Sequence, residues 1–111
     1  MNKFRRKRIA NVILELNKIK NDVQNETDID IVVRLEDLID VLTEALDEEE
    51  TYRDNMPENL QSGERYEKAE NACDSLDSAV SSLEFIEEDD SVEYINQTIT
   101  DAICELEKAI E

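Results

Sequence analysis

The stretch YEKAENACDSLDSAVSSL, residues 66–83, decides the fold class of this 111-residue chain. Its apolar residues recur at alternating steps of three and four, which is typical of an α-helix with one continuous apolar seam. A single helix cannot bury such a seam alone, so the sequence has to supply other helices that cover it. The seam consists of Tyr66, Ala69, Cys73, Leu76, Val80 and Leu83.

Segments on both sides of this stretch repeat the helical spacing. Short links separate them, which favours antiparallel neighbours. We therefore predict an all-α fold, a small antiparallel helical bundle of about four helices, near 3–24, 28–55, 63–87 and 91–110. The apolar positions outside the first seam are Ile9, Val12, Ile13, Leu16, Ile19 and Val23, then Val32, Leu35, Leu38, Ile39, Leu42, Ala45 and Leu46, and finally Ile95, Ile99, Ala102, Ile103, Leu106 and Ile110.

Local signals mark the ends of these helices. Thr27 or Asp28 is expected to cap the second helix, and Pro57 to end it, because the residue before a proline avoids the α region. Asp90, followed by Glu93 three residues later, fits a capping box for the fourth helix.

Charge divides the chain into two parts. The formal net charge is −18, from 30 acidic and 12 basic residues. Residues 1–20 hold seven basic residues and one acid, for a sum of +6, whereas residues 21–111 hold five basic and 29 acidic residues, for a sum of −24. We predict one domain, 1–111, with a basic N-terminal helix (1–24) and an acidic helical body (25–111). Gly63 is the only glycine and there is no histidine, which excludes glycine-rich phosphate loops and histidine-based catalysis.

The acidic body repels nucleic acids and anionic membranes and attracts basic protein surfaces. A helix rises about 1.5 Å per residue and B-DNA carries one charge per about 1.7 Å of axis, so acid-rich helices approach the charge density of a duplex edge. This pattern favours nucleic-acid mimicry, in which carboxylates pair with Lys and Arg of a protein target. The simpler alternative is that the acids only keep the bundle soluble. The expected contacts are Glu36, Asp37, Asp40, Glu44, Asp47, Glu48, Glu49 and Glu50.

Other kinds of site receive weaker support. The runs 47–50 and 87–90 invite a metal interpretation, but consecutive helical residues diverge by about 100°, and we predict no metal site, cofactor or catalytic residue. Cys73 and Cys104 both lie on predicted apolar stripes, so core packing is favoured over a redox pair. The five cations between Lys3 and Arg8 either bind phosphates or, as we prefer, dock on the acidic surface of the same chain or of a second copy.

The segment DEEETYRDNMPENLQSGERYE, residues 47–67, resembles a family of short acidic helical proteins encoded by phages, prophages and plasmids, mostly of Gram-positive and gut bacteria. The similarity covers about residues 44–86, with a weaker match at 5–8. In that family a serine precedes Glu-Arg, whereas here Gly63 stands in that place and Ser62 one residue earlier. The motif reads as a helix–loop–helix corner in which Met56 and Leu60 plug the open end of the hairpin. The family has no general activity to carry over, but small acidic proteins of mobile elements include anti-CRISPR and anti-restriction inhibitors.

The sequence and the resemblance together predict a non-enzymatic acidic protein-binding module of phage or prophage origin, which inhibits a host defence nuclease. The expected partner is a basic surface of a nucleic-acid-binding defence enzyme. We expect no direct nucleic-acid binding by the acidic body and no membrane association, and the sequence does not decide between a monomer and a homodimer. No run reaches the ~18 apolar residues of a membrane span, so a cytoplasmic location in the bacterial host is expected. The alternatives are a helical assembly or scaffold protein that acts through coiled-coil-like seams, and an acidic carrier for a basic protein.

Overall fold

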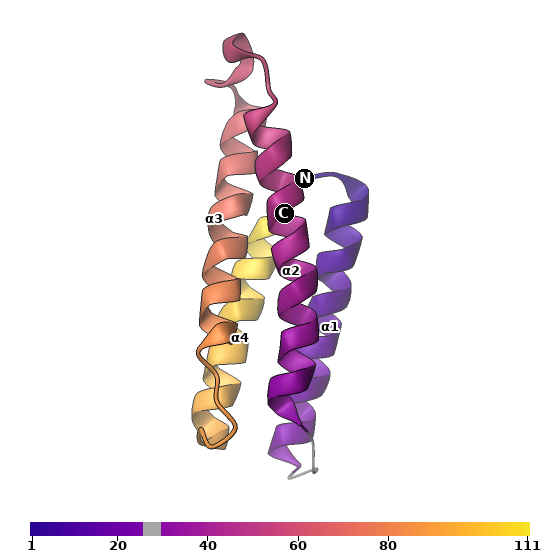
Figure 1. The fold of residues 1–111 in the computed structure, drawn as a ribbon, viewed down its shortest axis with the longest axis vertical. Helices are drawn as coiled ribbons and strands as arrows, with labels where there is room; N and C mark the ends of the chain where they lie inside the picture. The colour runs from indigo at the N-terminus through magenta and orange to yellow at the C-terminus, as the bar shows by residue number, and fades with distance from the viewer. Residues whose placement is uncertain (26–29) are drawn as a thin grey trace.

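The computed structural model describes residues 1–25 and 30–111, and within them the chain forms four α-helices. These are α1 (Lys3–Gln24), α2 (Ile31–Asp54), α3 (Glu64–Glu84) and α4 (Val92–Ala109), with a 3-10 turn, η1 (Glu58–Leu60), between α2 and α3 (Figure 1). The predicted all-α bundle is confirmed. The molecule is a rod of 53 × 21 × 19 Å.

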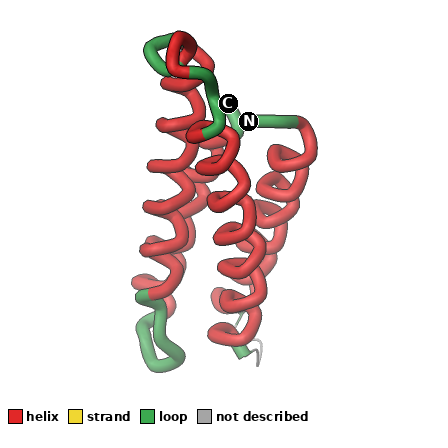
Figure 2. Tube along the Cα trace, turned by 45° about the horizontal axis from the view of Figure 1, so that its top comes forward, coloured by secondary structure: helices red, strands yellow, loops and turns green. Residues whose placement is uncertain are grey.

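Each helix packs against two others around one shared core. The order around the bundle is α1, α2, α3, α4, and consecutive helices run antiparallel (Figures 1 and 2). The seam that decided the fold class is buried from Ala69 to Leu83, where it faces the apolar stripes of the neighbouring helices. The largest fully buried apolar side chains are Ile9, Leu16, Ile19, Leu35, Leu42, Leu76, Leu83, Ile99 and Leu106.

The helix caps differ from the predicted ones. Ser91, not Asp90, caps α4: its Oγ accepts a hydrogen bond of 3.2 Å from the backbone N–H of Tyr94, the third residue of the helix. Asp90 instead closes the preceding turn, where its Oδ2 accepts from the N–H of Glu87 at 2.8 Å. Asp30 caps α2, and the predicted caps, residues 27 and 28, lie outside the described residues.

The α2–α3 hairpin extends beyond the other two helices (Figure 1). We call residues 52–66 the tip. Met56 and Leu60 were predicted to plug this end, and the prediction is wrong for Leu60, which is 49% exposed, whereas Met56 is half-buried; an open hollow of about 570 Å³ lies beside both residues. The physical reason is that α1 and α4 stop below the tip, so none of the described helices covers it.

Candidate functional site

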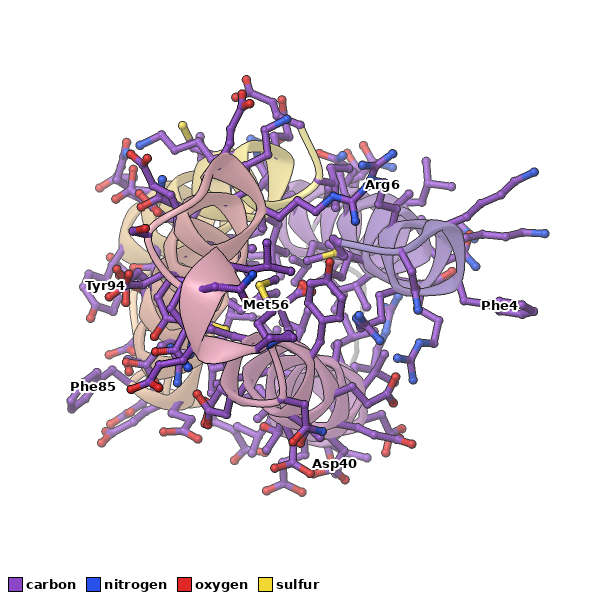
Figure 3. The ribbon with its side chains drawn as sticks, turned by 90° about the horizontal axis from the view of Figure 1, so that it is seen from above. Phe4, Arg6, Asp40, Met56, Phe85 and Tyr94 are labelled. Carbon is purple, nitrogen blue, oxygen red and sulfur yellow. The ribbon has the colours of Figure 1, made fainter. Side chains whose placement is uncertain are left out.

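The outer face of α2 carries a row of exposed carboxylates. The helix directs Ile31, Leu35, Leu42 and Ala45 into the core, and residues on the opposite side of the 3.6-residue repeat therefore face solvent. Five of the eight predicted contact residues lie there and are exposed: Glu36, Asp37, Asp40, Glu44 and Asp47. We call these five residues the acidic row. Seen along the bundle, Asp40 points away from the other helices (Figure 3).

Most of the acidic row carries uncompensated charge. Among the described residues, Glu36, Asp37, Asp40 and Asp47 take part in no ion pair. Glu44 makes one long contact, 3.9 Å from Arg8, while its side chain stays 70% exposed. These carboxylates are held on a rigid helix and available to an external cation.

The structure removes Glu49 from the predicted contact surface. Its side chain is fully buried, and its Oε1 lies 3.3 Å from the Arg5 guanidinium. The N-terminal ammonium of Met1 lies 3.9 Å from its other carboxylate oxygen. Glu49 is buried because it continues the core stripe of α2, seven residues after Leu42 and four after Ala45. That spacing was the signal in the sequence, and interpreting Glu49 by its residue type alone missed it.

Glu48 and Glu50 are only half-exposed. Glu48 accepts a hydrogen bond of 2.7 Å from Arg8 and lies 3.6 Å from Arg5, so α1 already neutralises it. Glu50 makes no ion pair with any described residue and adds negative potential near Cys73 on α3. On α2, the acids that face outward are therefore the row of five, which shares only Asp47 with the run 47–50.

The basic segment of α1, residues 3–8, also contains both paired and exposed side chains. Arg5 and Arg8 dock on the chain's own acids, which confirms the preferred interpretation for these two residues. Arg5 is buried, and its guanidinium lies 5.9 Å from the centre of the Tyr52 ring. Lys3, Arg6 and Lys7 remain exposed, and Phe4 beside them is 82% exposed and points outward (Figure 3).

The two cysteines have different environments. Cys73 is buried as predicted, whereas the core position predicted for Cys104 is wrong, because this residue is exposed beside the buried Ile103. Both thiols are free. Burial raises the pKa of the Cys73 thiol from 9.0 to about 11, with Arg53 opposing the shift and Glu49, Glu50 and Asp74 adding to it.

An acidic cluster closes the turn between α3 and α4. One carboxylate oxygen each from Glu87, Asp89 and Asp90 lies within 4.8 Å of the others. Asp90 is engaged with the backbone of Glu87, as described above, which accounts for part of this convergence without an ion. Glu87 and Asp89 are exposed, where water solvates their charge.

No protein-family model matches the chain, and neither a curated protein nor a solved structure is significantly similar to it. The described helices include none that is both long enough and apolar enough to cross a membrane.

Proposed function

We propose that the chain is a non-enzymatic protein-binding module that inhibits a nucleic-acid-binding defence enzyme of a bacterial host by nucleic-acid mimicry. The observation that carries the proposal is the acidic row, with four of its five carboxylates unpaired within the described residues. The resemblance of residues 47–67 to proteins of phages, prophages and plasmids supports the class of target, and such a protein would act in the host cytoplasm.

The spacing of the row suits a site that normally holds a polyanion. From Glu36 to Asp47 there are eleven helical steps, or about 17 Å, and the rises between successive carboxylates are about 1.5, 4.5, 6 and 4.5 Å, which average about 4 Å. Phosphates along one strand of B-DNA recur about every 3.4 Å. A row of Lys and Arg spaced to receive one strand can therefore pair with successive carboxylates, and the rigid helix loses little conformational entropy on binding.

The structure gives less support to the alternative of a helical assembly protein. The seam at 66–83, which could have received a partner helix, is buried in the chain's own core from Ala69 onward. The acidic row, in contrast, lies on the surface, and four of its five carboxylates pair with no cation among the described residues.

The test is a capture experiment with two matched variants. The first neutralises the acidic row (E36Q/D37N/D40N/E44Q/D47N). The second neutralises five exposed acids on α3 (E67Q/E70Q/D74N/D77N/E84Q), and therefore changes the net charge equally at another place. Each tagged chain is incubated with bacterial lysate at about 0.05 M and about 0.5 M salt, where screening differs strongly.

The proposal predicts that the wild type and the α3 variant capture a basic nuclease at low salt and inhibit its cleavage of DNA or RNA. The row variant should capture and inhibit at least about tenfold less, since several charge-assisted contacts are lost together. Capture that is insensitive to salt, equal loss in both variants, or a captured partner without nuclease activity would each contradict the proposal. The last of these outcomes would favour the acidic carrier instead.

A further inference from the structure

The apolar stripe of α2 continues past the end of the four-helix core. Its buried positions Leu42, Ala45 and Glu49 are followed by Tyr52 and Met56, and the whole series keeps the alternating steps of three and four. Viewed along the bundle from the tip, Met56 lies over the middle of the four helices (Figure 3). The inner face of the tip is therefore an extension of the core.

Two of the four helices are missing at that level. α1 begins at Lys3, where Asn2 caps it, and Arg5 in its first turn meets Glu49. α4 ends at Ala109, beside Ala72 of α3. Beyond these levels α2 and α3 alone continue among the described helices, so the stripe becomes partly exposed: Tyr52 is 41% and Leu60 49% exposed, and Met56 and Tyr66 are half-buried.

We propose that a second copy of the chain covers this face. The two tips lie side by side and antiparallel, so that each hairpin fills the space beyond the α1 and α4 ends of the other. Four helical segments, two from each copy, then bury Tyr52, Met56, Leu60 and Tyr66 in an isologous interface.

The charge of the tip indicates that the partner covering it is a second copy of the chain. The tip holds two cations and three carboxylates, for a sum of −1, in a chain whose net charge is −18. Two copies that meet at their tips therefore repel each other far less than two copies that meet at their acidic faces. A tip with one sign of charge would point to a partner of the opposite sign, whereas a nearly balanced surface fits itself.

The few charges at the tip are also self-complementary. Arg65 is exposed and makes no ion pair with any described residue, and the same is true of Glu58 and Glu64. A two-fold axis brings Arg65 of each copy against the acids of the other and repeats every contact. The hollow of about 570 Å³ beside Leu60 supplies the volume that an apolar side chain of the second copy occupies.

This geometry predicts a weak and elongated dimer. The apolar face is small, which places the association in the range of transient complexes, with a Kd of about 10 μM. The two acidic bodies point in opposite directions, and the dimer should be nearly twice as long as the 53 Å monomer. A dimer built from the α1 or α2 faces would instead be hardly longer than one chain.

The experiment measures mass and shape on the full chain. Sedimentation equilibrium between about 1 μM and about 1 mM covers both sides of the expected Kd. Small-angle X-ray scattering at the upper concentrations gives the maximum dimension. M56E and L60D place a charge on the tip face, and F85D makes the same kind of change at the opposite end, where Phe85 is 73% exposed.

The wild type and F85D should form the elongated dimer, whereas M56E and L60D should raise the Kd by about a hundredfold or more, because a buried uncompensated charge is very unfavourable. L60D leaves the helices outside the tip untouched, so its helical circular dichroism should equal that of the wild type. R65E should weaken the dimer, and mixing it with E58K/E64K should restore association. A monomer throughout the range, a dimer no longer than one chain, or a dimer that withstands L60D would each overturn the proposal.

Discussion

Removing one member of the buried Arg5–Glu49 pair should destabilise the chain more than removing both. The substitution to make first is Arg5→Met, which keeps the length of the aliphatic side chain that packs at this end of the bundle. It leaves the fully buried Glu49 carboxylate with a single partner, the N-terminal ammonium at 3.9 Å. Breaking a buried ion pair costs about 3–5 kcal/mol. Because the N-terminal ammonium remains, we expect Arg5→Met to lower the free energy of unfolding by about 3 kcal/mol, the low end of that range.

The effect of Glu49→Gln on the free energy of unfolding should have opposite signs in the wild type and in the R5M variant. In the wild type it removes the partner of Arg5, which keeps Glu48 at 3.6 Å, and we expect a loss of about 1–2 kcal/mol. In the R5M background the same change neutralises a buried carboxylate that has lost its guanidinium partner and keeps only the N-terminal ammonium at 3.9 Å among the described residues, so it should restore about 2 kcal/mol. The double variant should therefore lie within about 1 kcal/mol of the wild type.

Urea unfolding followed by circular dichroism measures these four free energies. A loss of 3 kcal/mol should also lower the melting temperature by about 15 °C in a domain of this size. The control is Arg8→Met, which breaks the half-exposed pair with Glu48 and should cost less than about 1 kcal/mol. If E49Q destabilises both backgrounds equally, Arg5 and Glu49 are not energetically coupled and the reasoning fails.

Three further predictions concern other parts of the chain. Raising the NaCl concentration from about 0.01 to about 1 M shortens the Debye length from about 30 to about 3 Å. Because the added salt screens the repulsion within a chain of net charge −18, the melting temperature should rise, and a fall would contradict this expectation. The Cys73 thiol, whose pKa is raised to about 11 in the folded chain, stays protonated while the unfolded thiol ionises near 9.0, so stability should fall as the pH rises from about 9 to about 11. Cys73→Ala should flatten that part of the stability profile, and a thiol reagent at pH 8 should modify Cys104 rapidly and Cys73 only on unfolding. Ser91→Ala should cost about 1 kcal/mol in urea unfolding, with helix fraying at the start of α4, whereas Asp90→Ala should leave that first turn intact in hydrogen exchange.

The helices were predictable because their signal is local. The periodicity of apolar residues located all four, and their observed ends lie within a few residues of the predicted ones. The caps were less predictable, since Asp90 and Ser91 are adjacent and both suit the position. Which of them caps depends on the backbone of the turn, where Asp90 is held by the N–H of Glu87.

The candidate site was predictable only where burial follows from one helix. The acidic row lies opposite the core stripe of α2, and its exposure follows from the helical repeat. The positions of Arg5 and Glu49 on the core stripes of α1 and α2 follow from the helical repeat, but their pairing depends on the position of α1 along α2, which no spacing within either helix records. The open tip has the same origin, because Met56 would be covered if α1 and α4 extended further past Glu49 and Ala72.

The buried Arg5–Glu49 pair accounts for the register of α1 along α2. The apolar core stripe of α1 consists of Ile9, Val12, Leu16 and Ile19, and side chains this similar in size discriminate only weakly between registers one turn apart. A shift of one turn moves Arg5 by about 5.4 Å and places Ile9 or Met1 opposite Glu49, so the buried carboxylate loses its guanidinium partner. The pair is not fully satisfied even in the observed register, since Arg5 Nε and Glu49 Oε2 are buried without a hydrogen-bond partner. A pair that adds little net stability but excludes the neighbouring registers acts mainly on specificity. The R5M/E49Q double variant should accordingly keep most of its stability while the amide signals of α1 split or broaden, whereas sharp single signals would show that apolar packing alone fixes the register.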